Sequence, residues 1–183
     1  LEAWEGPESA ETDLRRIVLS YAILAPSPHN IQPWLVDLTG SNSMDLYVDQ
    51  ERLLPESDPT FRQVHIAQGA FLENLAIAAR HFGLAADLTY FPQGSYGNSV
   101  IENKPVASIV LSPNASLGPI PLFDSILNRQ SNKRVYDGIP LSEEQLEILS
   151  AIDPGIEGIS LFVTDDDVEE EEDELFPELI PLL

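Results

Sequence analysis

Residues 26–34 read PSPHNIQPW and connect a predicted helix to a predicted strand. Each proline in this stretch lacks a backbone donor and disfavours the α conformation in the residue before it. The stiffened backbone therefore holds Ser27, Asn30 and Gln32 close together. Their side chains can donate to and accept from the polar edge of a flat heterocycle, and the prolines offer it an apolar face. An ordinary connection whose polar side chains cap their own backbone is the alternative, and the pattern alone leaves both open.

A helix precedes this stretch and a hairpin follows it. Apolar residues recur at helical spacing over residues 13–24, and Asp13 is placed to cap the helix at its start. Residues 33–38 and 44–49 are typical of two strands, because β-forming runs flank a turn rich in Gly, Ser and Asn.

The long apolar segment at residues 60–82 predicts a central helix. We expect this helix to begin at Asp58-Pro59, with aspartate as cap and proline in the first turn. Its residues are apolar around most of its circumference, which is typical of a helix at the centre of a core or of a dimer. The other expected elements are strands at 86–91, 106–111 and 159–163, and helices at 122–129 and 142–152, the last opened by the capping pattern of Ser142 and Gln145.

The chain of 183 residues is strongly acidic, with a formal net charge of −22. Ten of its 31 acidic residues lie within residues 165–178, which leaves 21 acids against nine bases elsewhere. Such a charge repels nucleic acid and anionic membranes. We expect the acidic tail, residues 165–183, to be solvated and disordered, or else to act as a flap.

The composition also limits metal and membrane chemistry. There is no cysteine, which excludes disulfides and cysteine-ligated metals, and the three histidines form no recognisable ligand set. No run of about 18 apolar residues is present, so no membrane span is expected.

A basic cluster at residues 128–134, NRQSNKR, holds three of the nine basic residues. Arg129 can bind a phosphate through its planar guanidinium, Lys133 adds a point charge, and Ser131 adds a hydroxyl donor. The alternative is that these bases pair with nearby carboxylates or with the acidic tail.

Together, these motifs resemble the nitroreductase superfamily. PSPHNIQPW is similar to its P-S-x-x-N-x-Q-P-W signature, residues 69–84 are similar to its central helix, and Arg129-x-Ser131-x-Lys133 is similar to its phosphate-binding element. The resemblance implies an α+β, nitroreductase-like fold, with a central mixed or antiparallel sheet flanked by helices and a long buried central helix.

Two further stretches, Asp49-x-x-Arg52-Leu53-Leu54-Pro55 and Asp58-Pro59-x-x-Arg62, resemble the Acg-type branch, in which one duplicated chain mimics the usual homodimer. The resemblance then implies a first repeat at about 13–111 and the start of a second at about 122–163. On this reading residues 1–164 form the domain, and most of the second repeat is missing. The chain would be part of a pseudo-dimer within a longer parent chain, or of a homodimer.

The resemblance implies FMN as the cofactor and NAD(P)H as the hydride donor, with a nitroaromatic or quinone-like acceptor. Arg129, Ser131 and Lys133 would hold the phosphate and ribityl chain, and Ser27, Asn30 and Gln32 would approach the ring system. No catalytic side chain and no metal ligand is nominated, and the opposite flavin site would be missing or degenerate. His29, beside the ring-binding loop, would be placed to contact cofactor or substrate.

Two other functions remain open from the sequence: a protein that binds or sequesters FMN without reductase activity, and an interaction protein that has lost its cofactor. The Acg-type resemblance favours a location in the cell envelope, reached by export, with the cytoplasm as the alternative. Leu1 at the start of the chain fits a processed export signal and a cloning boundary alike.

Overall fold

A computed structural model describes residues 5–135, 138–152, 161 and 163. The chain divides into two compact units, Leu1–Ser131 and Asn132–Leu183. The first unit holds the sheet and three of the described α-helices, and the second holds α4 (Glu143–Ser150). The predicted acidic tail, and the predicted strand at 159–163 apart from Leu161 and Val163, lie outside the described residues.

A four-stranded antiparallel sheet forms one layer of the first unit. Its strand order is β1-β2-β4-β3, so β4 lies between β2 and β3. Ala107 of β4 accordingly pairs with Leu46 on one side and with Tyr90 on the other. The strands are β1 (Trp34–Asp37), β2 (Ser43–Val48), β3 (Leu84–Tyr90) and β4 (Ala107–Pro113). The predicted α+β class and the predicted hairpin are both confirmed.

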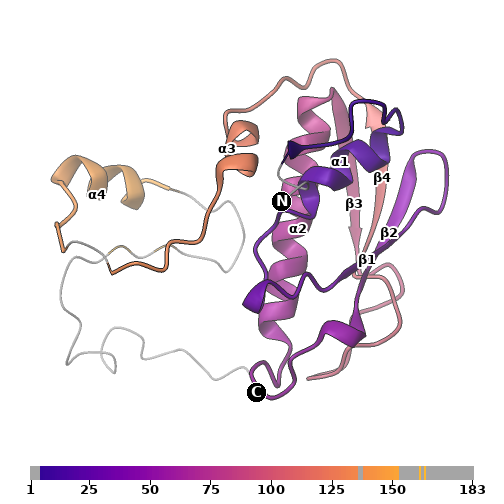
Figure 1. The fold of residues 1–183 in the computed structure, drawn as a ribbon, viewed down its shortest axis with the longest axis horizontal. Helices are drawn as coiled ribbons and strands as arrows, with labels where there is room; N and C mark the ends of the chain where they lie inside the picture. The colour runs from indigo at the N-terminus through magenta and orange to yellow at the C-terminus, as the bar shows by residue number, and fades with distance from the viewer. Residues whose placement is uncertain (1–4, 136–137, 153–160, 162, 164–183) are drawn as a thin grey trace. The chain divides into compact units, whose positions relative to one another are not determined.

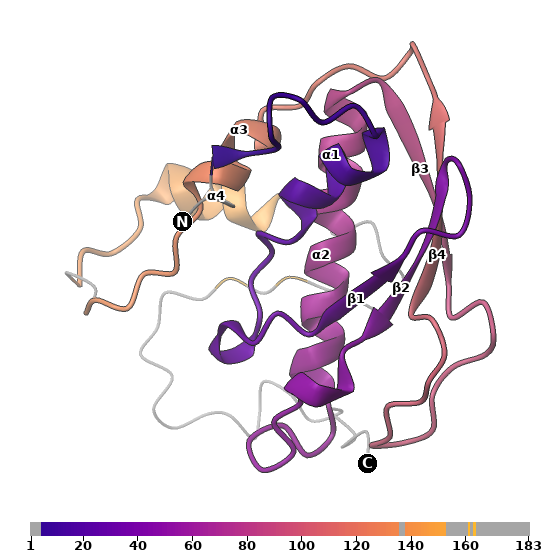
Figure 2. The ribbon, with the colours of Figure 1, turned by 45° about the vertical axis from the view of Figure 1, so that its right-hand side comes forward.

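The long helix α2 (Arg62–His81) is the central element of the unit. It packs against the sheet through β3 and against α1 (Leu14–Ala22), and both ribbon views show α1 beside α2 (Figures 1 and 2). Phe71 and Leu75 of α2 are fully buried in the main core, which also contains Val18 and Met44. The predicted buried central helix is therefore confirmed, although one side of it stays exposed to solvent at Ile66 and Gly69.

The predicted start of α2 at Asp58-Pro59 is wrong by three to four residues. The helix begins at Arg62, because Phe61 adopts a left-handed conformation with φ of 55° and turns the chain just before it. Asp58 still caps the helix from upstream: its buried carboxylate accepts hydrogen bonds from the backbone N–H groups of Gln63 at 3.3 Å and Val64 at 3.1 Å. The capping residue was predicted correctly, but the turn between cap and helix was not.

The helices α1 and α4 begin at their predicted caps. Asp13 accepts a hydrogen bond from the Arg15 N–H at the start of α1, and the Arg15 side chain lowers the pKa of Asp13 to about 2. Ser142 and Gln145 form the complete capping box at the start of α4. A short helix, α3 (Leu122–Asn128), closes the first unit and contacts α2. None of the helices in the described part of the chain is long and apolar enough to cross a membrane.

Candidate functional site

The loop that carries Ser27, Asn30 and Gln32 has an unusual backbone. It contains the short 3₁₀ helix η2 (Pro28–Asn30), and three of its non-glycine residues lie in the left-handed region: φ is 49° at His29, 57° at Asn30 and 50° at Gln32. Only a few per cent of non-glycine residues adopt positive φ, and such residues cluster at ligand clamps and active sites. The concentration of three in four positions marks this loop as a candidate site.

The structure shows features of both interpretations of this loop, the ligand-binding loop and the connection that caps its own backbone. Ser27 Oγ accepts a hydrogen bond from the Gln32 N–H at 3.0 Å, so this polar side chain does cap its own backbone. The Ser27 hydroxyl keeps its hydrogen for donation elsewhere. Asn30 is exposed: its backbone N–H donates to the Ser27 carbonyl at 3.0 Å, while its side-chain amide faces solvent. The loop therefore contains an internal hydrogen bond, and it also presents polar groups that can contact a ligand.

Side chains from two other elements fix the loop in place. Gln68 of α2 is buried, and its Nε2 donates to the Pro33 carbonyl at 2.6 Å. Arg52, at the end of the short helix η3 (Gln50–Arg52), donates from Nη1 to the Ile31 carbonyl at 3.2 Å and from Nε to Asp49 at 3.0 Å. Sequence reasoning gave no role to either residue. Gln68 could have been found as a lone glutamine on an otherwise apolar helix. Arg52 could have been found from the Asp49-x-x-Arg52 stretch.

The Arg129 side chain contacts the backbone just before the same loop. It follows α3 directly, is half-buried, and donates from Nη2 to the Leu24 carbonyl at 3.1 Å, three residues before Ser27. This contact joins residues 105 positions apart in the chain. Ser131, the last residue of the first unit, and Lys133, in the second unit, are both exposed. Of the predicted basic element, then, Arg129 is the member that contacts the loop region.

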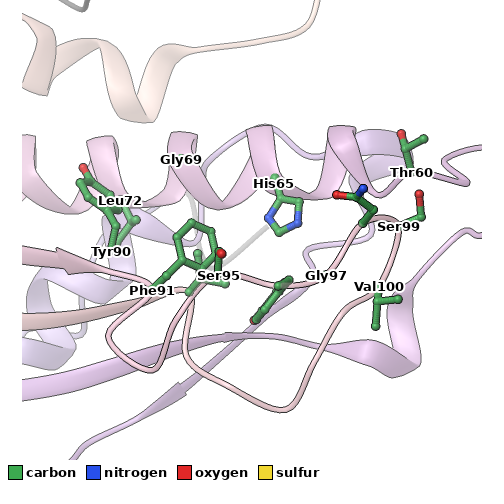
Figure 3. A pocket seen from close by; sticks show the side chains of 13 residues that line it. Thr60, His65, Gly69, Leu72, Tyr90, Phe91, Ser95, Gly97, Ser99 and Val100 are labelled. Atoms are coloured by element: carbon green, nitrogen blue, oxygen red, sulfur yellow. The ribbon is translucent and has the colours of Figure 1, made fainter. Parts of the chain in front are cut away.

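A separate cavity of about 410 Å³ lies between α2 and the loop that joins β3 to β4. Figure 3 shows His65 projecting from α2 toward this loop, which carries Phe91. The His65 ring lies 6.2 Å from Phe91 and 5.6 Å from Tyr96, measured between ring centroids. This aromatic pocket was not predicted from the sequence, because its walls come from segments about 30 residues apart.

The other two histidines lie apart from this pocket. His29 is exposed and lines a cavity of about 570 Å³ together with residues 53–57, beside the PSPHNIQPW loop. The His81 ring stacks on Phe123 with a centroid separation of 3.6 Å. Within the described ranges, no three His, Asp or Glu residues come close enough to hold a metal ion.

His65 should make the stability of the protein depend on pH. Burial lowers the pKa of His65 from its ordinary value of 6.5, and the Asp58 carboxylate opposes part of that shift. Because folding favours the neutral imidazole, this contribution to stability is complete above pH 6.5 and is lost as the pH falls through the lowered pKa of the folded state. As the pH falls from about 7.5 to about 5, the free energy of unfolding should decrease less in His65→Gln than in the unmodified chain. Urea titrations at each pH measure this difference.

The matched control is His29→Gln, which removes an exposed histidine. The pH dependence of the unfolding free energy should be weaker in His65→Gln than in His29→Gln. An identical pH dependence in His65→Gln and the unmodified chain would contradict the assignment.

Parts of this chain are similar in sequence to known proteins. No family model matches the chain. A Mycobacterium tuberculosis protein provisionally named an NAD(P)H nitroreductase is 26% identical over 153 residues, which is 80% of this chain and 42% of that protein. A second protein of that organism, provisionally named the NAD(P)H nitroreductase Acg, is 31% identical over 81 residues, or 44% of this chain and 24% of that protein. The chain is nitroreductase-like.

The nitroreductase-like chain spans less than half the length of both relatives. Among solved structures, a protein of Desulfovibrio desulfuricans that is provisionally named a nitroreductase, and described as a complex with FMN, is 20% identical to it. That comparison covers 71% of this chain and 84% of the other, with a TM-score of 0.42.

Proposed function

We propose that this nitroreductase-like chain binds FMN and contributes to an NAD(P)H-dependent reductase site. The observation that supports the proposal is the hydrogen bond from Arg129 to the carbonyl of Leu24, two residues before the PSPHNIQPW loop. FMN, when bound, would supply the hydride chemistry that links NAD(P)H to a nitroaromatic or quinone-like acceptor. No side chain of this chain needs to act as a nucleophile.

The donor set around the loop fits the chemistry of a flavin nucleotide. Arg129 brings positive charge to a chain of net charge −22, as a phosphate requires in such surroundings. Ser131, in the same unit as Arg129, would add a hydroxyl donor to the same phosphate and ribityl chain. Ser27, Asn30 and Gln32 carry the hydroxyl and amide groups that match the polar edge of an isoalloxazine.

Gln68 and Arg52 hold the backbone of the loop that carries Ser27, Asn30 and Gln32. Gln68 and Arg52 bond the carbonyls of Pro33 and Ile31, which keeps the left-handed loop in one conformation before a ligand arrives. Rigid donors lose less entropy when a ligand binds, so they bind more tightly than mobile ones. We propose that the remaining parts of the flavin site come from the rest of a duplicated parent chain, or from a second copy of this one.

Oxidation of NAD(P)H by the full chain with added FMN tests the proposal, with nitrofurazone or menadione as acceptor. Multiple turnovers, well above the rate of free FMN at the same concentration, are the expected result. The control is Arg129→Ala at the same protein concentration, which should lose rate at limiting FMN. Bound flavin with no NAD(P)H oxidation would contradict the reductase function and favour the FMN-sequestering alternative.

A further inference from the structure

The cavity between α2 and the β3–β4 loop is uncharged, in contrast to the rest of the chain. Charged residues make up 22% of the sequence, yet none of the 13 residues that line this cavity is Asp, Glu, Lys or Arg. Its volume of about 410 Å³ lies in the range of small-molecule sites. We infer that this cavity binds a neutral, planar aromatic molecule, at a site separate from the FMN-binding loop.

Three aromatic rings give the cavity its selectivity for flat molecules. The His65, Phe91 and Tyr96 rings meet at tilted or edge-on angles of 50° to 74°, with centroids 5.6 to 6.2 Å apart. Aromatic rings attract one another in such edge-on and offset arrangements, so a further ring can join the group through the same contacts. Because burial lowers the pKa of His65, its imidazole stays uncharged at neutral pH and adds no cation to the cavity wall.

Neutral polar groups on the loop can bind the polar substituents of such a molecule. Ser95 and Ser99 line the cavity from the β3–β4 loop, and Thr60 lines it from the segment before α2 (Figure 3). Asn98 of the same loop also lines it. Hydroxyl and amide groups can donate to a hydroxyl, carbonyl or nitro oxygen without bringing a charge. The set therefore favours a neutral ligand over an anion.

The β3–β4 loop is held in a defined shape by its own contacts. The Tyr96 hydroxyl donates to the Lys104 carbonyl at 2.6 Å, and the Gly97 N–H donates to Glu102 at 3.1 Å. Glu102 also pairs with the Lys104 ammonium at 2.8 Å, so the two charges of this loop region neutralise each other. Phe91 and Ser99 have positive φ of 45° and 52°, conformations that persist in proteins only where the surrounding contacts fix them.

This site does not depend on the proposed FMN function. None of residues 26–34, and neither Arg129 nor Ser131, lines the cavity. Ile31 packs on the same small core as Phe91 and Tyr96, so the two sites share supporting structure but no lining residue. A ligand in the cavity can therefore bind whether or not flavin is present.

Calorimetric titration of the full chain with 2-naphthol tests the inference, with 2-naphthalenesulfonate as the anionic counterpart. We expect saturable binding of one 2-naphthol per chain, no measurable binding of the sulfonate, and no change in 2-naphthol affinity when FMN is added in excess. Equal binding of the two compounds, or loss of 2-naphthol binding with FMN, would overturn the inference.

Two variants at Gly69 keep the test independent of folding defects. Gly69 lines the cavity on the exposed side of α2, and a Cβ placed there meets nothing within 4 Å. Gly69→Leu should fill the cavity and abolish 2-naphthol binding, while Gly69→Ala should bind as the unmodified chain does. Both replacements favour the helix, because glycine is a poor helix former. Unchanged binding in Gly69→Leu would refute the site.

Phe91→Ala gives an independent measure of the ring contacts. We expect it to weaken 2-naphthol binding by about tenfold, which corresponds to the loss of one aromatic ring contact. Binding of 2-naphthol that is unaltered in Phe91→Ala would show that the aromatic rings do not hold the ligand.

Discussion

Arg129→Ala is expected to weaken FMN binding by about 1.5–3 kcal/mol, which corresponds to about tenfold to 150-fold in dissociation constant. The reason is the loss of a charge-assisted hydrogen bond to phosphate, in a chain whose acidic residues outnumber its basic ones by 22. Fluorescence titration of FMN with the unmodified chain and with the variant measures the change.

Arg16→Ala is the matched control for this substitution. Arg16 is an exposed arginine on α1, so the variant removes the same charge without touching the loop. It should bind FMN as the unmodified chain does. Because Arg129 also bonds the Leu24 carbonyl, the unfolding free energy of both variants should be measured alongside. Equal FMN affinities in Arg129→Ala and Arg16→Ala would contradict the phosphate-binding role.

Phe71→Ala is expected to lower the unfolding free energy by about 3–5 kcal/mol, the usual cost of truncating a fully buried phenylalanine. Phe71 has no exposed surface, and its ring lies 5.2 Å from that of Trp34, the last residue of the PSPHNIQPW loop. The loss combines removed apolar burial with a cavity between α2 and β1. Urea titration followed by circular dichroism measures the change.

The control for Phe71→Ala is Tyr90→Ala, which truncates an aromatic residue that is 62% exposed. Loss of an exposed side chain on a strand costs about 1 kcal/mol or less. Similar losses in the two variants would contradict the arrangement in which α2 packs its Phe71 face into the core.

Local signals in the sequence predicted local structure well. The Asp13 cap, the Ser142–Gln145 capping box and the strands of the hairpin are confirmed because each depends on residues within a few positions of one another. The insertion of β4 between β2 and β3 was not predictable in this way, since it pairs Leu46 with Ala107 across about 60 residues.

The candidate site was predictable only in part, for the same reason. The PSPHNIQPW loop and Arg129 stood out by residue type, and in the structure the Arg129 side chain bonds the carbonyl of Leu24, two residues before the loop. The left-handed conformations of His29, Asn30 and Gln32 carry no comparable signal, because none of these residues is glycine. The supporting bonds from Gln68 and Arg52, and the aromatic pocket at His65, depend on tertiary contacts that periodicity does not report.

The central claim, that this chain binds FMN through its PSPHNIQPW loop and Arg129, is tested most directly by equilibrium dialysis of the purified chain against FMN. We expect saturable uptake of one FMN per chain, or per pair of chains if two copies share a site, with the flavin absorbance bands on the protein side. An equal FMN concentration on both sides of the membrane at every concentration tried would contradict the claim.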